Sequence, residues 1–354
     1  MDQGETEKKS ARISAEDIIR AKCILDDYRA QMAKLIVAQK DMIDGLLMAL
    51  IAGGHILLEG APGLAKTLAV KSLAAITGLE FKRIQFTPDL LPADLTGTLV
   101  WESSQGTFSV RKGPVFTNIV LADEINRAPA KVQSALLEAM EEYQVTIGEN
   151  TWPLSDPFFV LATQNPIEQE GTYQLPEAQL DRFFLKLLIN YPAGDDELQI
   201  LKLNNSLSGV RQGSKPPPVE TVLNKQTLET LREWANRIHV DENIDRYIVS
   251  LVAATRPQAT QKSGGGFDMP SKTGREGIYR YISYGASPRA SIALHTCAKI
   301  IALFAGNSFV RPEDVKKAAL PVLRHRLVLT YEAEADALDA DAIINRILSS
   351  VPVP

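Results

Sequence analysis

One segment constrains the fold of this 354-residue chain more than any other: residues 60–67 read Gly-Ala-Pro-Gly-Leu-Ala-Lys-Thr. An apolar run at 56–58 precedes it, and an Ala- and Leu-rich pattern typical of a helix follows it. This order predicts a strand, a phosphate-binding loop and a helix. In such a loop backbone N–H groups bind phosphate oxygens, a lysine contacts the terminal phosphates and a hydroxyl ligates Mg²⁺. Lys66 and Thr67 fit the last two roles.

Ala65 departs from the usual pattern, in which glycine precedes the lysine. A side chain at this position should narrow the backbone geometries open to the loop. The spacing still fits a phosphate loop, and the flanking strand and helix favour that interpretation over a glycine-containing turn that happens to end in Lys-Thr. The residues expected to bind a nucleotide are Gly60, Ala61, Pro62, Gly63, Leu64, Ala65, Lys66, Thr67, Leu68 and Gln39.

A second apolar run, at 119–122 after Asn118, is followed by two adjacent acids, Asp123 and Glu124. Ligands of open parallel sheets bind beyond the carboxyl ends of the strands. We therefore expect Asp123 to hold Mg²⁺ through its water shell, and Glu124 to polarise the water that attacks the γ-phosphate of a bound nucleotide. Solvation of a strand end would also explain two adjacent acids, but the phosphate loop makes that explanation the weaker one.

Two further polar residues adjoin predicted strands. Asn165 follows the strand predicted at 158–163, where it would align the attacking water or sense the γ-phosphate; the alternative is a turn residue chosen to precede Pro166. Arg182 precedes the strand predicted at 184–189. It fits a residue that acts in trans on a neighbouring subunit's γ-phosphate, worth on the order of 10³-fold in rate. It equally fits a strand-edge salt bridge worth ~0–1 kcal/mol, and the sequence leaves both open.

Arg289 lies in a third motif, Gly-Ala-Ser-Pro-Arg-Ala at 285–290. Ser287 is the predicted helix cap and Pro288 the first helical residue, which puts Arg289 in the first turn. A cation there opposes the helix macrodipole at a cost of roughly 0.3–1 kcal/mol. This placement suggests that Arg289 contacts an anion.

Strands that alternate with helices up to about residue 190 predict an α/β core with a parallel sheet covered on both faces. Two β-hairpins, near 99–110 and 145–152, are predicted inserts in that core. The alternation breaks at 191–197, and helical patterns follow. We expect a leader and helix over 1–34, a nucleotide-binding core over 35–192 and a smaller all-α lid domain over 193–354.

The lid contains a Gly-rich stretch at 256–282 with five basic and two acidic residues. It is typical of a flexible loop. A basic loop that contacts an acidic partner is the other interpretation.

Composition narrows the class of protein. A net charge of −5 argues against a nucleic-acid partner and gives no bulk attraction to an anionic membrane. No run approaches the roughly 18 apolar residues that span a bilayer, and residues 1–12 lack the apolar core of a secretory signal. Cys23 and Cys297 are too few for a disulfide framework, and the four histidines have no metal-ligand spacing. These features favour a cytoplasmic protein.

The chain resembles AAA+ ATPases, and most closely the MoxR family, over about residues 35–330. Ala65 is usual in that family. The resemblance rests on five segments, which are 53–67, 123–128, 162–166, 175–183 and 285–289.

The resemblance implies roles for single residues. Lys66 and Thr67 would bind phosphate and Mg²⁺, and Asp123 with Glu124 would form the second Walker motif. Asn165 would be the first sensor and Arg289 the second, and Arg182 resembles the trans-acting arginine finger. Gln39 lies where related folds contact adenine, although an exposed residue in a helix connection explains it equally well. The two hairpins would be the inserts of the helix-2-insert group.

The family also implies a function. Its members are thought to form homo-hexameric rings when ATP binds and to act as chaperones that mature or activate client proteins. The clients often carry von Willebrand factor A domains and bound metal. Two alternatives stay open: a DNA-working motor related to replicative helicases, and a nucleotide-gated scaffold with little turnover of its own.

Overall fold

The computed structural model describes residues 12–104, 106–166, 172–208, 219–257 and 277–354. The chain forms two compact units. The first comprises Asp27–Gln226, and the second comprises Thr227–Pro354 with the N-terminal residues up to Asp26. The sequence predicted a boundary after residue 192, whereas this division falls after Gln226. The functional domain bounds stay a prediction. Most of the Gly-rich stretch at 256–282 lies outside the described residues.

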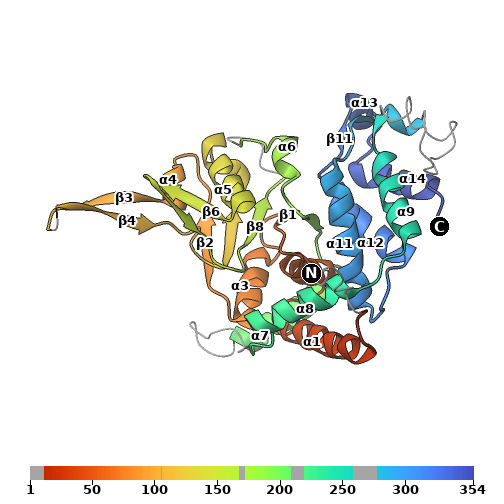
Figure 1. Ribbon diagram of the computed structural model, residues 1–354, viewed down its shortest axis with the longest axis horizontal. Coiled ribbons are helices and arrows are strands. Elements are labelled where there is room, and N and C mark those ends of the chain that lie inside the picture. The colour runs from red at the N-terminus through yellow and green to blue at the C-terminus, as the bar shows by residue number, and fades with distance from the viewer. Residues whose placement is uncertain (1–11, 105, 167–171, 209–218, 258–276) are drawn as a thin grey trace, which may run out of the picture. The chain divides into compact units, whose positions relative to one another are not determined.

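A five-stranded parallel sheet forms the centre of the first unit, as the α/β pattern predicts (Figure 1). Neighbouring strands pair in the order β2, β5, β8, β1 and β9. Their bounds are Phe81–Gln85, Ile119–Asp123, Phe159–Gln164, Ile56–Gly60 and Leu185–Ile189 respectively. The three middle strands are almost wholly buried, which is why they read as continuous apolar runs rather than as alternating patterns.

Helices follow the strands along the chain and supply the apolar side chains that cover them. On α5, the buried residues Val132, Leu136, Leu137 and Met140 form the predicted apolar stripe and join a core cluster with residues of β5 and β8. The helices of this unit are α2 Lys40–Ala52, α3 Lys66–Thr77, α4 Pro92–Thr96, η1 Ile125–Arg127, α5 Ala130–Glu142, α6 Glu177–Leu180 and α7 Gly194–Ser208. α1 (Ala15–Ala33) crosses the division between the two units.

Both predicted hairpins are present in the first unit. β3 (Gly97–Glu102) pairs with β4 (Thr107–Lys112), and β6 (Gln144–Ile147) pairs with β7 (Asn150–Pro153). The β3–β4 hairpin extends away from the sheet (Figure 1). The hairpins therefore interrupt the α/β alternation as inserts without joining the parallel sheet.

The second unit is mainly helical, in line with the predicted lid. Besides its helices it contains a short antiparallel ribbon, in which β10 (Ile282–Tyr284) pairs with β11 (Val328–Leu329). Its helices are α8 Lys225–Arg237, whose first two residues belong to the first unit, α9 Glu242–Ala253, α11 Pro288–Phe304, α12 Pro312–Leu323, α13 Tyr331–Ala335 and α14 Ala340–Ser350.

His55 is a buried histidine that links elements of the first unit. Its Nδ1 accepts the backbone N–H of Val160, at 3.1 Å, so Nε2 carries the proton and donates to the carbonyl of Met140, at 3.0 Å. Burial lowers the pKa of this imidazole to about 4. His55 is therefore neutral and structural, as the lack of metal-ligand spacing suggested.

We expect His55 to make the free energy of unfolding fall by up to about 3 kcal/mol between pH 7 and pH 4. In the unfolded chain the imidazole takes up a proton as the pH falls through its ordinary pKa of 6.5, whereas the folded protein resists protonation down to about pH 4. The contribution of neutral His55 to the free energy of unfolding is thus complete above pH 6.5 and is lost as the pH falls toward 4. Urea denaturation of the wild type and of His55→Leu across this range measures it.

Both proteins share the same carboxylates, so their difference in stability isolates the imidazole. The advantage of the wild type over His55→Leu should shrink steadily as the pH falls. A difference that is the same at pH 7 and pH 4.5 would contradict the assignment.

Candidate nucleotide site

The predicted phosphate loop connects β1 to α3, and its backbone is unusual at two positions. Gly63 has φ +84°, with open space where a Cβ would lie, so glycine is needed there for its conformation. Ala65 also adopts the left-handed region, with φ 56° and ψ 17°. That conformation costs a non-glycine residue roughly 1–2 kcal/mol. The loop therefore holds Ala65 in the left-handed conformation, which glycine adopts far more readily.

Gly60 is required for space. A Cβ there would lie 2.7 Å from the carbonyl oxygen of Ile189 on the neighbouring strand β9. The start of the loop is thus packed directly against the sheet.

Lys66 is the first residue of α3, and its Nζ donates to the carbonyl oxygen of Gly60 at 2.6 Å. Burial lowers the pKa of this half-buried ammonium, and the carboxylates of Asp123, Glu124 and Glu59 oppose that shift. The cation consequently lies at the loop and within the field of both predicted site acids, Asp123 and Glu124. Thr67 follows as the second residue of the same helix.

Asp123 is the last residue of β5 and is already engaged on both oxygens. Its Oδ2 accepts from Nε and Nη2 of Arg83, at 3.0 and 2.6 Å. Its Oδ1 accepts from the hydroxyl of Thr163 at 2.6 Å. That hydroxyl in turn accepts the backbone N–H of Glu124 at 2.9 Å, which connects the two acids through β8.

Glu124 has a left-handed backbone, with φ 57° and ψ 51°, directly after the strand. Its Oε2 accepts from Nε2 of Gln85 at 2.9 Å and from Nη1 of Arg127 at 3.1 Å. The Gln85 amide oxygen accepts from Arg83 at 2.6 Å. A connected polar network thus holds both carboxylates at the carboxyl edge of the sheet.

The sequence interpretation did not identify four members of this network, which are Arg83, Gln85, Arg127 and Thr163. The sequence offered one sign of it, because Arg83 and Gln85 are two residues apart in β2 and so lie on the same face of that strand. Their relation to the acids depends on the pairing of β2 with β5, which sets Gln85 opposite Asp123.

The other candidates in this unit have defined surroundings. Asn165 follows the last residue of β8, whose neighbour on β1 is Glu59, so it lies at the edge where the loop begins. It is 7% exposed. Gln39 precedes α2 and its Nε2 donates to the carbonyl of Asn190 at 3.3 Å. Contact of either residue with a nucleotide stays a prediction.

Arg182 forms a salt bridge with Glu141 of α5, with 2.8 Å between Nη2 and Oε2. Both side chains are about one-third exposed and line a hollow of about 640 Å³ that also contains Glu138 and Glu142. The structure thus contains the salt bridge expected of a structural arginine and also leaves the guanidinium accessible.

Arg289 belongs to the second unit. As predicted, Ser287 caps α11, and its hydroxyl accepts the backbone N–H of Arg289 at 3.1 Å. The contact of Arg289 with a nucleotide stays a prediction.

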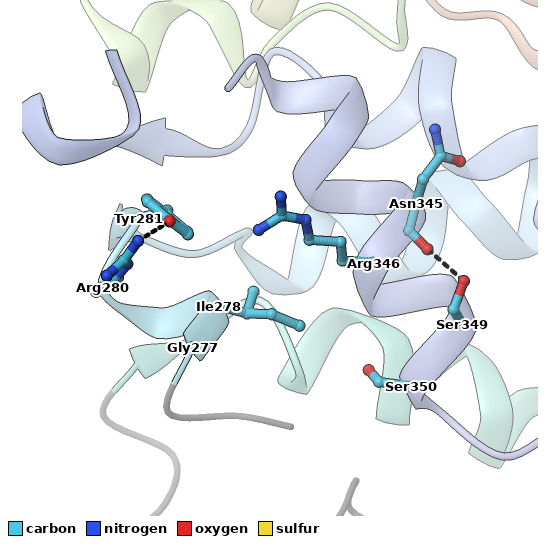
Figure 2. A pocket seen from close by; sticks show the side chains of 8 residues that line it. All are labelled: Gly277, Ile278, Arg280, Tyr281, Asn345, Arg346, Ser349 and Ser350. Carbon is cyan, nitrogen blue, oxygen red and sulfur yellow. Dashed lines mark hydrogen bonds between the residues drawn. The ribbon is translucent and has the colours of Figure 1, made fainter. Parts of the chain in front are cut away.

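Another hollow, of about 810 Å³, lies in the second unit between α14 and the residues that precede β10 (Figure 2). The Tyr281 ring lies 4.4 Å from the Arg280 guanidinium and 5.7 Å from that of Arg346. None of the predicted site residues lines this hollow.

The residues of the sheet edge fit a magnesium nucleotide. Thr67 and Asp123 offer the oxygen ligands that Mg²⁺ prefers, and Mg²⁺ in such sites commonly uses one or two carboxylates together with substrate phosphates. Within the described ranges no group of three or more His, Cys, Asp or Glu residues forms a metal site by itself. Among the helices of the described ranges, none has the length and apolarity needed to cross a bilayer.

Comparison with known proteins agrees with this site. Residues 55–185 match the model of the ATPase family associated with various cellular activities, and residues 278–347 match the AAA lid domain. Chaperone MoxR1 of Mycobacterium tuberculosis is 44% identical over 324 residues, which is 92% of this chain and 81% of the relative. The chain belongs to the MoxR family of AAA+ ATPases.

Two further proteins are similar to this chain over most of its length. The Bacillus subtilis protein YeaC is 44% identical over 91% of this chain and 92% of its own length. A crystal structure of a Cytophaga hutchinsonii protein assigned as an ATPase superposes with a TM-score of 0.84 at 45% identity, over 96% of this chain and 97% of that one. The MoxR-family fold and the AAA+ core with its helical lid are thus shown.

Proposed function

We propose that this MoxR-family chain hydrolyses ATP with Mg²⁺ and couples hydrolysis to the remodelling, maturation or activation of a client protein. The observation that carries the proposal is the convergence of Lys66, Asp123 and Glu124 on one edge of the sheet. The relative named as a chaperone supports the coupling to clients. Such a protein would work in the cytoplasm, as the composition suggests.

In this mechanism Lys66 exchanges the Gly60 carbonyl for oxygens of the terminal phosphates, and the loop N–H groups bind the remaining oxygens. Asp123 and Thr67 would hold Mg²⁺, which when bound neutralises charge on the β- and γ-phosphates. Glu124 orients and polarises the attacking water, and Asn165 aligns it. Because Glu124 is held by Gln85 and Arg127, hydrolysis requires its carboxylate to turn from these partners to the water.

Assembly completes the proposed site. We propose that ATP binding promotes a homo-hexameric ring in which Arg182 reaches the γ-phosphate of the neighbouring subunit, while Arg289 contacts the nucleotide from the lid. The accessible guanidinium of Arg182 supports the first contact, and the position of Arg289 in a helix first turn supports the second. The ion pair between Arg182 and Glu141 would open when the neighbour docks.

Arg182→Ala is expected to lower turnover on the order of 10³-fold, because a trans-acting arginine stabilises the charge of the transition state. Mixing tests the trans action directly. Glu124→Gln subunits retain the arginine, and Arg182→Ala subunits retain the acid, so mixed rings should recover activity that neither variant has alone. Phosphate release at several mixing ratios measures the recovery.

Glu141→Gln is the matched control, since it breaks the same ion pair but keeps Arg182. Its turnover should stay within about threefold of the wild type, because exposed ion pairs contribute ~0–1 kcal/mol. Equal losses in Arg182→Ala and Glu141→Gln, with no recovery on mixing, would assign Arg182 to a structural salt bridge.

Client capture tests the coupling. Glu124→Gln should hold ATP and prolong contact with clients, so it should retain specific proteins that Lys66→Ala, which cannot hold ATP, does not retain. A captured protein with a von Willebrand factor A domain would match the partner expected from the family resemblance. Salt-dependent retention on single-stranded DNA would instead favour the DNA motor, and ATP-driven assembly without phosphate release would favour the scaffold.

A further inference from the structure

Gln133 is a buried amide that the proposed mechanism does not use. It is the fourth residue of α5 and is 1% exposed, on the face of the helix that packs against the core. A buried amide lowers stability unless its polar atoms find partners. The partners of Gln133 therefore indicate why the core contains it.

The amide nitrogen of Gln133 lies close to three backbone carbonyl oxygens. Nε2 is 3.2 Å from the oxygen of Ile125, 3.1 Å from that of Ala128 and 2.9 Å from that of Tyr173. An amide has two N–H groups, so the three acceptors share two donors. One side chain thus serves carbonyls from two separate segments.

The first segment belongs to the proposed site, and the second is bonded to it. Ile125 and Ala128 bound the turn that directly follows Glu124, and this turn also carries Arg127, which contacts the Glu124 carboxylate. The second segment contains Tyr173, whose carbonyl is bonded to Gln133. A second hydrogen bond, from the N–H of Tyr173 to the carbonyl of Asn126 at 2.6 Å, joins the same two segments.

We propose that Gln133 is a positioning residue for ATP hydrolysis. By binding the carbonyls of Ile125, Ala128 and Tyr173 it fixes the turn after Glu124 against the backbone at Tyr173. The backbone of Glu124 then keeps the position from which its carboxylate can turn from Arg127 to the attacking water. Gln133 itself touches neither nucleotide nor water in this scheme, and the inference rests on the proposed ATPase function.

Gln133→Met tests the proposal, since methionine keeps the length and burial of the side chain but removes the donor. We expect kcat to fall about 10- to 100-fold, because small misplacements of catalytic groups have effects of this size. The KM for ATP and the Kd of a fluorescent ATP analogue should change by less than about threefold, because the phosphate loop is untouched. Steady-state kinetics with Mg²⁺-ATP and a binding titration give both values.

Val132→Ala is the control for a merely structural effect. Val132 is buried on the same helix, so its truncation to alanine should lower the melting temperature. The kcat of this variant should nevertheless stay within about twofold of the wild type. Gln133→Glu gives an independent readout. An ionised carboxylate repels the three carbonyls, whereas the protonated acid can donate to one of them, so its turnover relative to the wild type should rise as the pH falls from 8 to 6.

A kcat of Gln133→Met within twofold of the wild type would overturn the proposal, as would an equal loss in Val132→Ala. If Gln133→Met does not fold, the pH series of Gln133→Glu decides, and a pH-independent ratio to the wild type counts against positioning. A failure of the ATPase assignment is distinct: in that case the wild type itself releases no phosphate, or Glu124→Gln releases it at the wild-type rate.

Discussion

Lys66→Ala is expected to raise the Kd for ATP at least about 100-fold and to abolish turnover. The ammonium lies in the phosphate loop, 2.6 Å from the Gly60 carbonyl, and its half-buried position strengthens its attraction to phosphate. Hydrogen bonds between charged groups are about twice as strong as neutral ones. Loss of this cation leaves the terminal phosphates facing the carboxylates of Asp123 and Glu124 without the charge that offsets them.

Titration with a fluorescent ATP analogue, with and without Mg²⁺, measures the change. Lys71→Ala is the matched control, because Lys71 is an exposed lysine on the same helix. Its Kd should equal that of the wild type. If Lys66→Ala binds ATP as tightly as Lys71→Ala does, segment 60–67 is not the phosphate loop of this protein.

Glu124→Gln should lower turnover by about 10²–10⁴-fold, the range for loss of a catalytic base, while the Kd for ATP stays within about threefold. The amide is nearly the same shape as the carboxylate and its oxygen can still accept from Gln85 or Arg127, so the network should persist. It cannot, however, accept a proton from the attacking water. The chemical step is therefore lost and binding is kept.

Phosphate release and nucleotide binding are measured on the same preparations. Glu80→Gln, which changes an exposed acid beside β2, should leave both unchanged. Wild-type turnover in Glu124→Gln would reject Glu124 as the base, and a parallel loss of ATP binding would point to a damaged site instead of a missing base.

The strands and the two main motifs could be predicted because each rests on local pattern. The buried strands β1 and β5 read as apolar runs, and parallel strands bring Lys66 and Asp123 to one edge whatever their order in the sheet. The hairpins were also predictable, because turn residues separate short strands with apolar side chains. Local pattern thus sufficed for the fold class and for the placement of the loop and the acids.

The polar network depends on tertiary pairing that the sequence does not display. Arg83 reaches Asp123 only because β2 pairs with β5 in a fixed register, although the two strands are far apart in the chain. Gln133 reads as one polar residue in a helix until the turn after Glu124 folds back over it. The left-handed backbones of Ala65 and Glu124 were also beyond prediction, since both residue types normally avoid that region.

The central claim is that the edge of the sheet defined by Lys66, Asp123 and Glu124 hydrolyses ATP. Steady-state release of phosphate from ATP by the wild-type protein, with Mg²⁺ and then after chelation, tests it most directly. We predict repeated turnover that stops when Mg²⁺ is removed and that is lost in Glu124→Gln under saturating ATP. Bound ATP with no phosphate release by the wild type, or release that is the same in Glu124→Gln, would contradict the claim.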